Sequence, residues 1–460
     1  MKSHWKVKFT KNTYIVLAAF IVLGSVLVSK VAFNDSLQIR AIGLLISGLI
    51  LWISEALPMS IATLTLVFLM PFLGLMDYND IIENFGLGTS LFIMASSGIT
   101  VAIASSNIPN NITAFVFKKS QNHPRLLVFT LGMAITIFSG FVSSLATCTL
   151  FASLVTTTLK KADIKPQESN LGKALMLIIP ACAGIGGFIS PAGTPANILV
   201  IEILKTNGID ISFGKWFLIG APISLLMSTI FLLSVIIVVK PEKIQLLSDS
   251  IPTKLEKKDF TILSVIVFVV LGWFMSSIMP ILTTTGVAIL GLSVLFVPKH
   301  DILNIRNFSR GVNWDLVFTM GSVSVLMTGI SETGIITEII ESIFSSIMGA
   351  PDILILISVS LVICVIRAFI PTTTAVVALI APMLVGIANI TTLEFAPMLM
   401  VVAFWAATAL LLVHTEPIYL ITYKDGFYKQ KDLLYTGIIP SLLGGTVITV
   451  MIYYLTSYLI

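Results

Sequence analysis

Long apolar segments, separated by short polar loops, run through almost the whole chain. An α-helix needs about 20 mainly apolar residues to cross a bilayer. Eleven segments approach or exceed that length: 14–33, 38–54, 57–76, 86–106, 174–204, 216–239, 260–279, 283–298, 314–330, 396–422 and 433–457. We therefore predict an all-α polytopic membrane protein.

Two further apolar segments, 126–159 and 353–386, are rich in Ser and Thr near their middles. Each is too long for one plain span, and a straight crossing would leave polar backbone at the centre of the bilayer. Irregular backbone at membrane depth is tolerated only where protein or a water-filled cavity surrounds it. We therefore predict that both segments are re-entrant hairpins, which return to the side they started from.

Composition agrees with a membrane protein and excludes other classes. Hydrophobic residues make up 56% of the 460 residues and charged residues only 11%, whereas soluble domains carry about 25% charged residues. A soluble enzyme, a nucleic-acid binder and a disulfide-framed secreted domain are excluded. The three cysteines (Cys148, Cys182, Cys364) lie in apolar stretches without metal-binding spacing, so we expect them to pack as small hydrophobic residues.

The distribution of charge sets the orientation. Lysines precede the first apolar segment, which is long enough to span and lacks a small-residue cleavage site, so we predict a retained helix with a cytoplasmic N-terminus. With eleven spans, 22 of the 27 basic residues fall on the inside, as the positive-inside rule requires. We predict a multi-pass protein of the cell membrane, whose net charge of +4 reflects its cytoplasmic loops.

Weak self-similarity divides the chain into two copies. Asn84-Phe85 is echoed by Asn313-Trp314, and the first hairpin is echoed by the second. Each copy holds five spans and one hairpin, so the second copy is inverted, as in many secondary transporters. The predicted organisation is a first helix (1–37), a first repeat (38–239), a cytoplasmic linker (240–259) and a second repeat (260–460).

Two long spans contain helix breaks. The first holds Gly193-Thr194-Pro195-Ala196-Asn197, and the second holds His414-Thr415-Glu416-Pro417. Proline and glycine interrupt the helical hydrogen bonds, and the broken ends expose N–H groups that bind anions and carbonyls that bind cations. The alternative is a packing kink. The recurrence of breaks and hydroxyl-rich hairpin tips at matching repeat positions favours a binding site.

Two ionisable residues lie at membrane depth, where such groups are costly and indicate function. Arg367 precedes the Thr372-Thr373-Thr374 cluster of the second hairpin, and His414 adjoins Thr415. Either could offset the charge of an anionic substrate. The alternatives are a structural pairing of Arg367 within its hairpin and an interior histidine held by Glu416.

The sequence resembles the divalent anion/sodium symporter family, the solute carrier family 13-like carboxylate transporters, over nearly the whole chain. Segment 52–58 (WISEALP) is similar to the family's W-x-T-E-A-[LI]-P signature, and segment 193–197 (GTPAN) is close to its G-T-P-P-N break. Asn313-Trp314 with Gly321-Ser322, and the segment from Gly426 to Gly437, also resemble family motifs. The resemblance implies a homodimer, an elevator-type transport domain moving against a scaffold domain, and di- or tricarboxylate substrates held between the hairpin tips.

The chain departs from the family at the sodium-site motifs. The family's hairpin tips read Ser-Asn-Thr, but here they read Ser144-Leu145-Ala146 and Thr372-Thr373-Thr374, and the second break reads Thr415-Glu416-Pro417-Ile418. Leu145 cannot coordinate a cation. We hypothesise that Arg367 and His414 supply the positive charge that sodium supplies in the family. A residual sodium site would lie near Ser144, Gly193, Thr372 and Thr415.

We predict a sodium-independent exchanger of C4–C5 dicarboxylates, such as succinate, malate or 2-oxoglutarate, without a cofactor. The alternative is a sodium- or proton-coupled symporter of di- or tricarboxylates or sulfate. An enzyme would need a nucleophile–base pair or a metal cluster, and the sequence shows neither. A channel would need repeated pore-lining rings of charged or carbonyl groups, which the sequence also does not show. The predicted substrate-binding residues are Ser143, Ser144, Leu145, Ala146, Thr147, Gly193, Thr194, Pro195, Asn197, Thr372, Thr373, Thr374, His414, Thr415 and Pro417.

Overall fold

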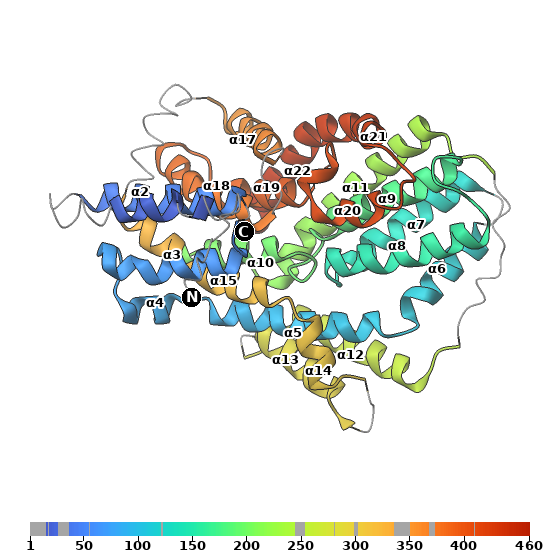
Figure 1. Ribbon diagram of the computed structural model, residues 1–460, viewed down its shortest axis with the longest axis horizontal. Helices are drawn as coiled ribbons and strands as arrows, with labels where there is room; N and C mark the ends of the chain where they lie inside the picture. The colour runs from blue at the N-terminus through green and yellow to red at the C-terminus, as the bar shows by residue number, and fades with distance from the viewer. Residues whose placement is uncertain are drawn as a thin grey trace, which may run out of the picture. The chain divides into compact units, whose positions relative to one another are not determined.

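Every regular element in the described part of the chain is a helix. The computed structural model describes residues 15–16, 18–25, 36–54, 56–120, 123–243, 254–279, 281–298, 302–334, 350–367, 373–408 and 410–460. They form two compact units, shown in Figure 1 and described separately below. Each unit takes segments from both predicted repeats, so the packing does not follow the linker at 240–259.

Unit 1 consists of helices from the beginning of the chain and from its second half. It contains α2 (Leu37–Ser54), α3 (Met59–Leu73), α4 (Tyr78–Asn84), the start of α5 (Leu87–Ala104), α15 (Trp314–Ser331) and the second half of α18 (Thr373–Ile390). Helix α3 packs against α2, α4 and α15.

The two repeat-related Asn-aromatic motifs meet within unit 1. Gly86 N donates a hydrogen bond to Gly321 O at 3.2 Å, and Ser90 Oγ donates to Val317 O at 2.8 Å. The Phe85 ring lies directly over Gly321, where a larger residue would not fit. The similarity between these motifs in the sequence therefore corresponds to two segments that lie side by side.

Unit 2 holds the remaining helices. They are most of α5, α6 (Ile108–Lys119), α7 (Pro124–Ser139), α8 (Ser144–Lys161), α9 (Asn170–Gly186), α10 (Pro195–Thr206), α11 (Phe213–Val239), α12 (Lys257–Ser276), α13 (Thr284–Leu295), α14 (Ile305–Gly311), α17 (Asp352–Arg367), the start of α18, α19 (Phe395–Ala407), α20 (Pro417–Tyr423), α21 (Gln430–Leu443) and α22 (Thr449–Leu459).

The core of unit 2 is built around α9 and α19. Every residue of α19 is buried, as is nearly every residue of α9. A helix that is apolar on all sides must be enclosed by others, and α9 is in contact with α7, α8, α11 and α20. The two helix breaks directly follow these central helices, between α9 and α10 and between α19 and α20. Both breaks therefore lie inside the unit.

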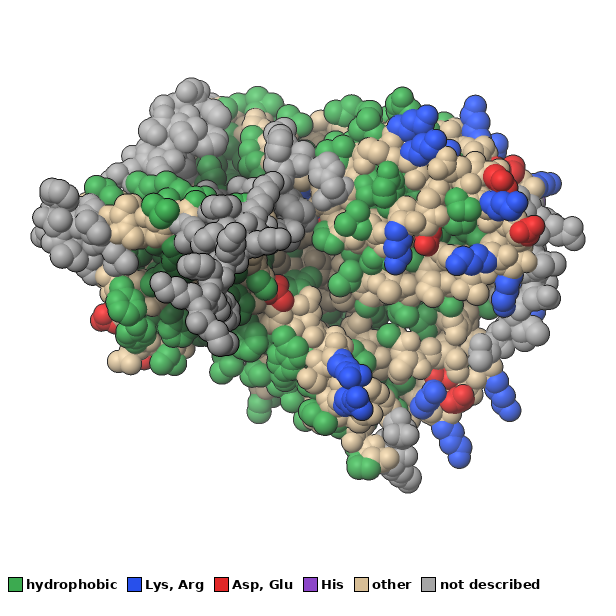
Figure 2. Space-filling view, in the orientation of Figure 1, with side chains coloured by type: hydrophobic (Ala, Val, Ile, Leu, Met, Phe, Trp, Pro, Cys, Tyr) green, Lys and Arg blue, Asp and Glu red, His purple; other side chains and the backbone are tan. Residues whose placement is uncertain are grey.

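Four helices in the described residues are long and apolar enough to cross a membrane by length and composition: Leu87–Ala104, Phe213–Val239, Lys257–Ser276 and Gln430–Leu459. Large apolar side chains project outward from them, such as Ile237, Phe268 and Tyr458. Outward apolar side chains of this density are typical of a lipid-facing surface. Figure 2 shows hydrophobic side chains over much of this face and most of its Lys and Arg side chains toward the right of the view.

The helices follow most predicted segments, with local differences. Segments 174–204 and 396–422 are each two helices with irregular backbone between them. The short helices α4, α6 and α14 were not predicted, because each is too short or too polar to resemble a span. Half of the predicted first span (14–33), Glu55, part of the linker (244–253) and Thr372 lie outside the described residues.

Candidate functional site

The first break separates α9 from α10. Helix α9 ends at Gly186, and α10 begins at Pro195, whose ring has no N–H to donate and suits the first helical position. Asn197 holds the intervening backbone, because its Nδ2 donates to Gly187 O at 2.7 Å and to Ser190 O at 2.8 Å. Asn197 is fully buried, and its Oδ1 has no hydrogen-bond partner in the described part of the chain.

The tip of the first hairpin is bound to this break. Helices α7 and α8 are in contact and are joined by residues 140–143. Ser144 N donates to Gly193 O at 3.1 Å, and Ser139 Oγ donates to Ala183 O at 2.6 Å. Ser190 Oγ, within the break, donates a hydrogen bond to Gly140 O in the hairpin tip. We call the hairpin tip (139–144) and the first break (187–194) to which it is bonded the first cluster.

The side chains of the first hairpin tip differ in what they offer. Thr147 is buried and donates to Val142 O at 3.3 Å, so it serves the fold. The hydroxyls of Ser143 and Ser144 are partly exposed and have no partner among the described residues. Leu145 is 46% exposed. The tip therefore presents two hydroxyl donors beside an apolar side chain.

The second break separates α19 from α20. After Ala407 the chain runs through a single 3₁₀ turn (Val413–Thr415) to Pro417, again the first residue of a helix. Gln430 on α21 holds this backbone by donating from Nε2 to Leu411 O at 2.8 Å and accepting from Val413 N at 2.9 Å. Thr415 is buried and donates to Leu412 O at 2.6 Å.

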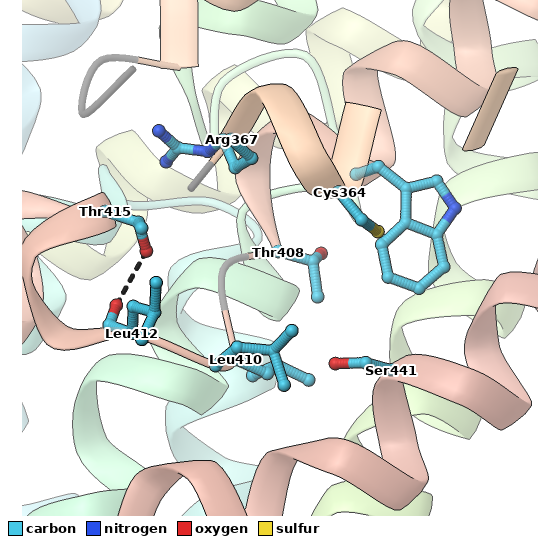
Figure 3. Close-up of a pocket in the computed structure, with 9 residues that line it drawn as sticks. Cys364, Arg367, Thr408, Leu410, Leu412, Thr415 and Ser441 are labelled. Carbon is cyan, nitrogen blue, oxygen red and sulfur yellow. Dashed lines mark hydrogen bonds between the residues drawn. The ribbon is translucent and has the colours of Figure 1, made fainter. Parts of the chain in front are cut away.

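A buried ion pair joins the second hairpin to the second break. The guanidinium of Arg367, at the end of α17, pairs with the carboxylate of Glu416. Arg367 Nε donates to Ala406 O at 2.7 Å, and Thr373 Oγ1, at the start of α18, donates to Glu416 Oε2 at 3.0 Å. We call Arg367, Thr373 and Glu416 the second cluster. Figure 3 shows the guanidinium directed away from Cys364 and Ser441.

Local electrostatics favours this placement of the arginine. Carbonyl groups at the end of a helix lack internal partners and carry partial negative charge. Arg367 terminates α17 and bonds a carbonyl in the last turn of α19. With only 3% of its side chain exposed, the cation depends on these carbonyls and on Glu416 for compensation.

A small cavity lies beside the second cluster. Its volume is about 50 Å³, and its walls include Arg367, Thr415, Thr408 and Ser441. The Thr408 hydroxyl is buried and has no hydrogen-bond partner in the described part of the chain. The rest of its wall is apolar (Cys364, Trp405, Leu410, Leu411 and Leu412). The guanidinium of Arg367 points away from Cys364 and Ser441 (Figure 3), so the cavity lies on the side that the charged end of the arginine does not face.

The two broken helices pack directly on each other. Helix α10 is in contact with α19, and α20 is in contact with α9 (Figure 1). Gly184 lies against Ala407 O, where a side chain would collide with backbone, and the Phe188 and Phe404 rings are 5.2 Å apart. Cys148 Sγ lies 3.3 Å from Ile418 O. Both breaks therefore belong to one packed region of unit 2.

The structure brings together most of the predicted residues, in two groups. Ser143, Ser144, Gly193, Thr194, Pro195 and Asn197 surround the first break, and Arg367, Thr373, Thr415 and Pro417 surround the second. Thr372 and the side chain of His414 lie outside the described residues. Among the described residues, no group of three or more His, Cys, Asp or Glu side chains could hold a metal ion.

Sequence reasoning missed two residues of the site. The sequence suggests Glu416 only as a partner of His414. In the structure Glu416 pairs with Arg367, although Glu416 itself lies outside the second hairpin. The available signal was that two opposite charges lie at membrane depth in the same half of the chain. Gln430 follows a charged loop, and nothing in its local sequence indicates that it reaches back to Leu411 and Val413.

The chain is similar to several known transporters. Residues 49–457 match the sequence family described as citrate transporter. The sodium-dependent dicarboxylate transporter SdcS of Staphylococcus saprophyticus is 22% identical over 88% of this chain and 83% of its own length. The inorganic phosphate transporter PHO87 of Saccharomyces cerevisiae is 23% identical over 78% of this chain but only 40% of its own length.

A solved structure shares the fold. The YdaH transporter of Alcanivorax borkumensis superposes with a TM-score of 0.55 at 12% identity, covering 82% of this chain and 87% of its own. These likenesses confirm the resemblance to divalent anion/sodium symporters and identify a multi-pass membrane transporter rather than an enzyme.

Proposed function

We propose that this chain, which belongs to the citrate transporter family, carries divalent organic anions across the membrane without sodium and exchanges one anion for another. C4–C5 dicarboxylates such as succinate, malate and 2-oxoglutarate are the proposed substrates. The proposal includes an elevator movement, a homodimer, and a cell-membrane location with a cytoplasmic N-terminus.

The observation that carries the proposal is the buried Arg367. Transporters with broken helices coordinate cations at the carbonyl ends of the half-helices. Here a guanidinium that is part of the chain bonds the carbonyl end of α19. A fixed cation in this place supplies positive charge to an anion site without taking sodium from solution.

The two clusters suit the two ends of a dicarboxylate. The first cluster offers the hydroxyls of Ser143 and Ser144, and the second offers Arg367 and the hydroxyl of Thr373. Short hydroxyls donate hydrogen bonds to carboxylates, and arginine adds charge to such a bond. We propose that each cluster receives one carboxylate.

The pairing with Glu416 changes the electrostatic reason for exchange. An empty site with a lone buried cation would resist crossing the membrane, but the Arg367–Glu416 pair carries no net charge. Separating the pair without a replacement anion costs about 3–5 kcal/mol, because one buried charge is left alone. We propose that the pair locks the empty site and that substrate opens it, which couples reorientation to occupancy.

Two alternatives have specific support. The buried Asn197 Oδ1, an acceptor that has no donor in the described residues, favours a sodium-coupled carrier, since a cation could coordinate it. The likeness to a yeast inorganic phosphate transporter favours phosphate, another oxyanion that the same donors could bind. Proton coupling and transport of tricarboxylates or sulfate are further possibilities.

Uptake into proteoliposomes tests the proposal. Radiolabelled succinate should enter vesicles preloaded with succinate or malate, should not accumulate in empty vesicles, and should be indifferent to a sodium gradient. Strong sodium-driven uptake into empty vesicles would reject exchange in favour of symport. Uptake of labelled phosphate that competes with no dicarboxylate would assign the chain to phosphate.

A further inference from the structure

Glu416 is placed to cap a helix but does not do so. It occupies the N-cap position of α20, where short side chains such as Asp, Asn, Ser and Thr commonly accept a hydrogen bond from the first turn of the helix. No such bond forms. The carboxylate instead accepts from Thr373 Oγ1 at 3.0 Å and pairs with Arg367. Its position is therefore set by the second hairpin.

The contacts of Glu416 are those that a substrate carboxylate would make. A guanidinium and a hydroxyl on one carboxylate form a charge-assisted recognition site. Resting on the function proposed above, we propose that Glu416 is a built-in competitor: its carboxylate binds Arg367 and Thr373 in the empty carrier, and a substrate carboxylate displaces it. Glu416 then sets the affinity of the site for any carboxylate that binds Arg367 and Thr373.

Exposure indicates which partner moves. The side chain of Glu416 is 15% exposed, but that of Arg367 is 3% exposed. Arg367 is also anchored through Nε to Ala406 O. The arginine therefore stays in place, and the carboxylate is the member of the pair that can swing away.

Displacement explains a preference for dianions. A monocarboxylate could only replace the contacts that Glu416 already makes, and would gain little from doing so. A dicarboxylate reaching the second cluster with one end gains additional hydrogen bonds from Ser143 and Ser144 with the other. Glu416 therefore lowers the affinity for both kinds of anion alike, and the second carboxylate of succinate supplies the contacts that make its binding favourable in spite of this cost.

The variant Glu416→Gln tests the proposal in purified full-length protein, with succinate and butyrate as the titrated probes. Removal of the competing carboxylate should tighten succinate binding by about tenfold or more and should tighten butyrate binding by a similar factor. Without anion the variant should melt at a lower temperature than the wild type, and succinate should restore more of its stability. The matched control is Asp425→Asn, whose carboxylate accepts from Thr156 Oγ1 at 2.9 Å outside both clusters, and it should leave both affinities unchanged.

Unchanged or weaker succinate binding by Glu416→Gln, beside normal binding by the wild type, would overturn the competitor role and leave the proposed function standing. If the wild type binds neither succinate nor malate, the proposed function fails, and this inference fails with it. The neutral double variant Arg367→Gln/Glu416→Gln leaves no lone charge, so it covers the case in which the single variant does not fold. It should lose succinate binding, and wild-type affinity in it would also overturn the proposal.

Discussion

Two amide side chains perform the same task at the two breaks from different places in the chain. Asn197, on α10 itself, bonds two carbonyls of the first break. Ile418 follows the second break and cannot bond in this way, and Gln430, from the neighbouring α21, bonds the backbone there instead. Irregular backbone inside a membrane protein must find such partners, so each amide is needed to keep its break in one conformation.

Asn197→Leu should strongly destabilise the protein. The substitution leaves the Gly187 carbonyl buried without its side-chain donor, at about 1–3 kcal/mol, and leaves Ser190 O with only its bond from Gly193 N. Thermal unfolding in detergent measures the effect. Asn207→Leu is the control, because Asn207 lies at the other end of α10 and its Nδ2 makes a single bond to Ile203 O near the surface. Equal losses in both variants would contradict the bridging role of Asn197.

The local chemistry of the breaks could be predicted from sequence, but their partners could not. Proline and glycine act on the backbone where they stand, so Pro195 and Pro417 mark the starts of α10 and α20 correctly. Glu416 is different, because its pairing with Arg367 depends on how α17 and α20 are brought together. Pairings set by tertiary packing leave no local pattern in the chain.

At the scale of elements, close backbone contact fixes the first hairpin against the broken helix. A Cβ on Gly186 would fall on the backbone of Thr136 in α7, so only glycine lets the two helices approach. One continuous helix over the predicted span 174–204 would not have required Gly186 to come this close to α7. The contact is the means by which the hairpin tip is held at the first break.

Gly186→Ala should therefore push α7 away from α9, lowering the free energy of unfolding by about 1–3 kcal/mol and reducing transport. Thermal unfolding and proteoliposome uptake together measure this. Gly445→Ala is the control, since a Cβ there meets no atom within 4 Å. A stable, fully active Gly186→Ala would show that the packing of the hairpin is looser than described.

A second element-scale device caps α3 from another helix. The N-cap of α3 is Pro58, which offers no side-chain bond. Asp315, in the first turn of α15, instead accepts from Ser60 N at 3.1 Å and from Ser60 Oγ at 2.5 Å. Asp315 thus serves α3 as a capping residue would.

Asp315→Ala should lower the free energy of unfolding by about 1–2 kcal/mol, the usual effect of losing a cap. Asp315→Asn keeps an acceptor oxygen and should lose much less. Chemical denaturation of both variants provides the comparison. A similar loss in the two variants would mean that the charge of Asp315, rather than its bond to Ser60, matters for α3.

At the scale of the whole molecule, the sequence predicted the class of protein well and its packing units poorly. Apolar content and segment length depend on composition alone, so the helical membrane architecture follows directly. The units do not, because each joins segments from both repeats. The short helices α4 and α14, which precede α5 and α15, are not predicted, because each has only seven residues and is too short to be identified as a membrane span.

The charge distribution predicts which loops face the cytoplasm. Lys165 and Lys205 are both exposed and lie at opposite ends of the segment formed by α9 and α10, Lys165 before α9 and Lys205 in the last turn of α10. Lys205→Cys should react with an impermeant maleimide added to intact cells, and Lys165→Cys should react only after lysis. Labelling of both from the outside would reject the predicted topology. The native Cys148 and Cys182 are buried, and a Cys364→Ala background removes the remaining thiol.

The buried pair of Arg367 and Glu416 also constrains how this protein can evolve. A mutation that removes either residue alone strands the other charge in the interior, so lineages must pass through the loss of both, or through a compensating partner, to abandon the pair. Among relatives, the two positions are then expected to covary as a unit. A homologue that has neutral residues at both would lack both the arginine donor and the carboxylate that competes for it, and would need another donor to bind a substrate carboxylate.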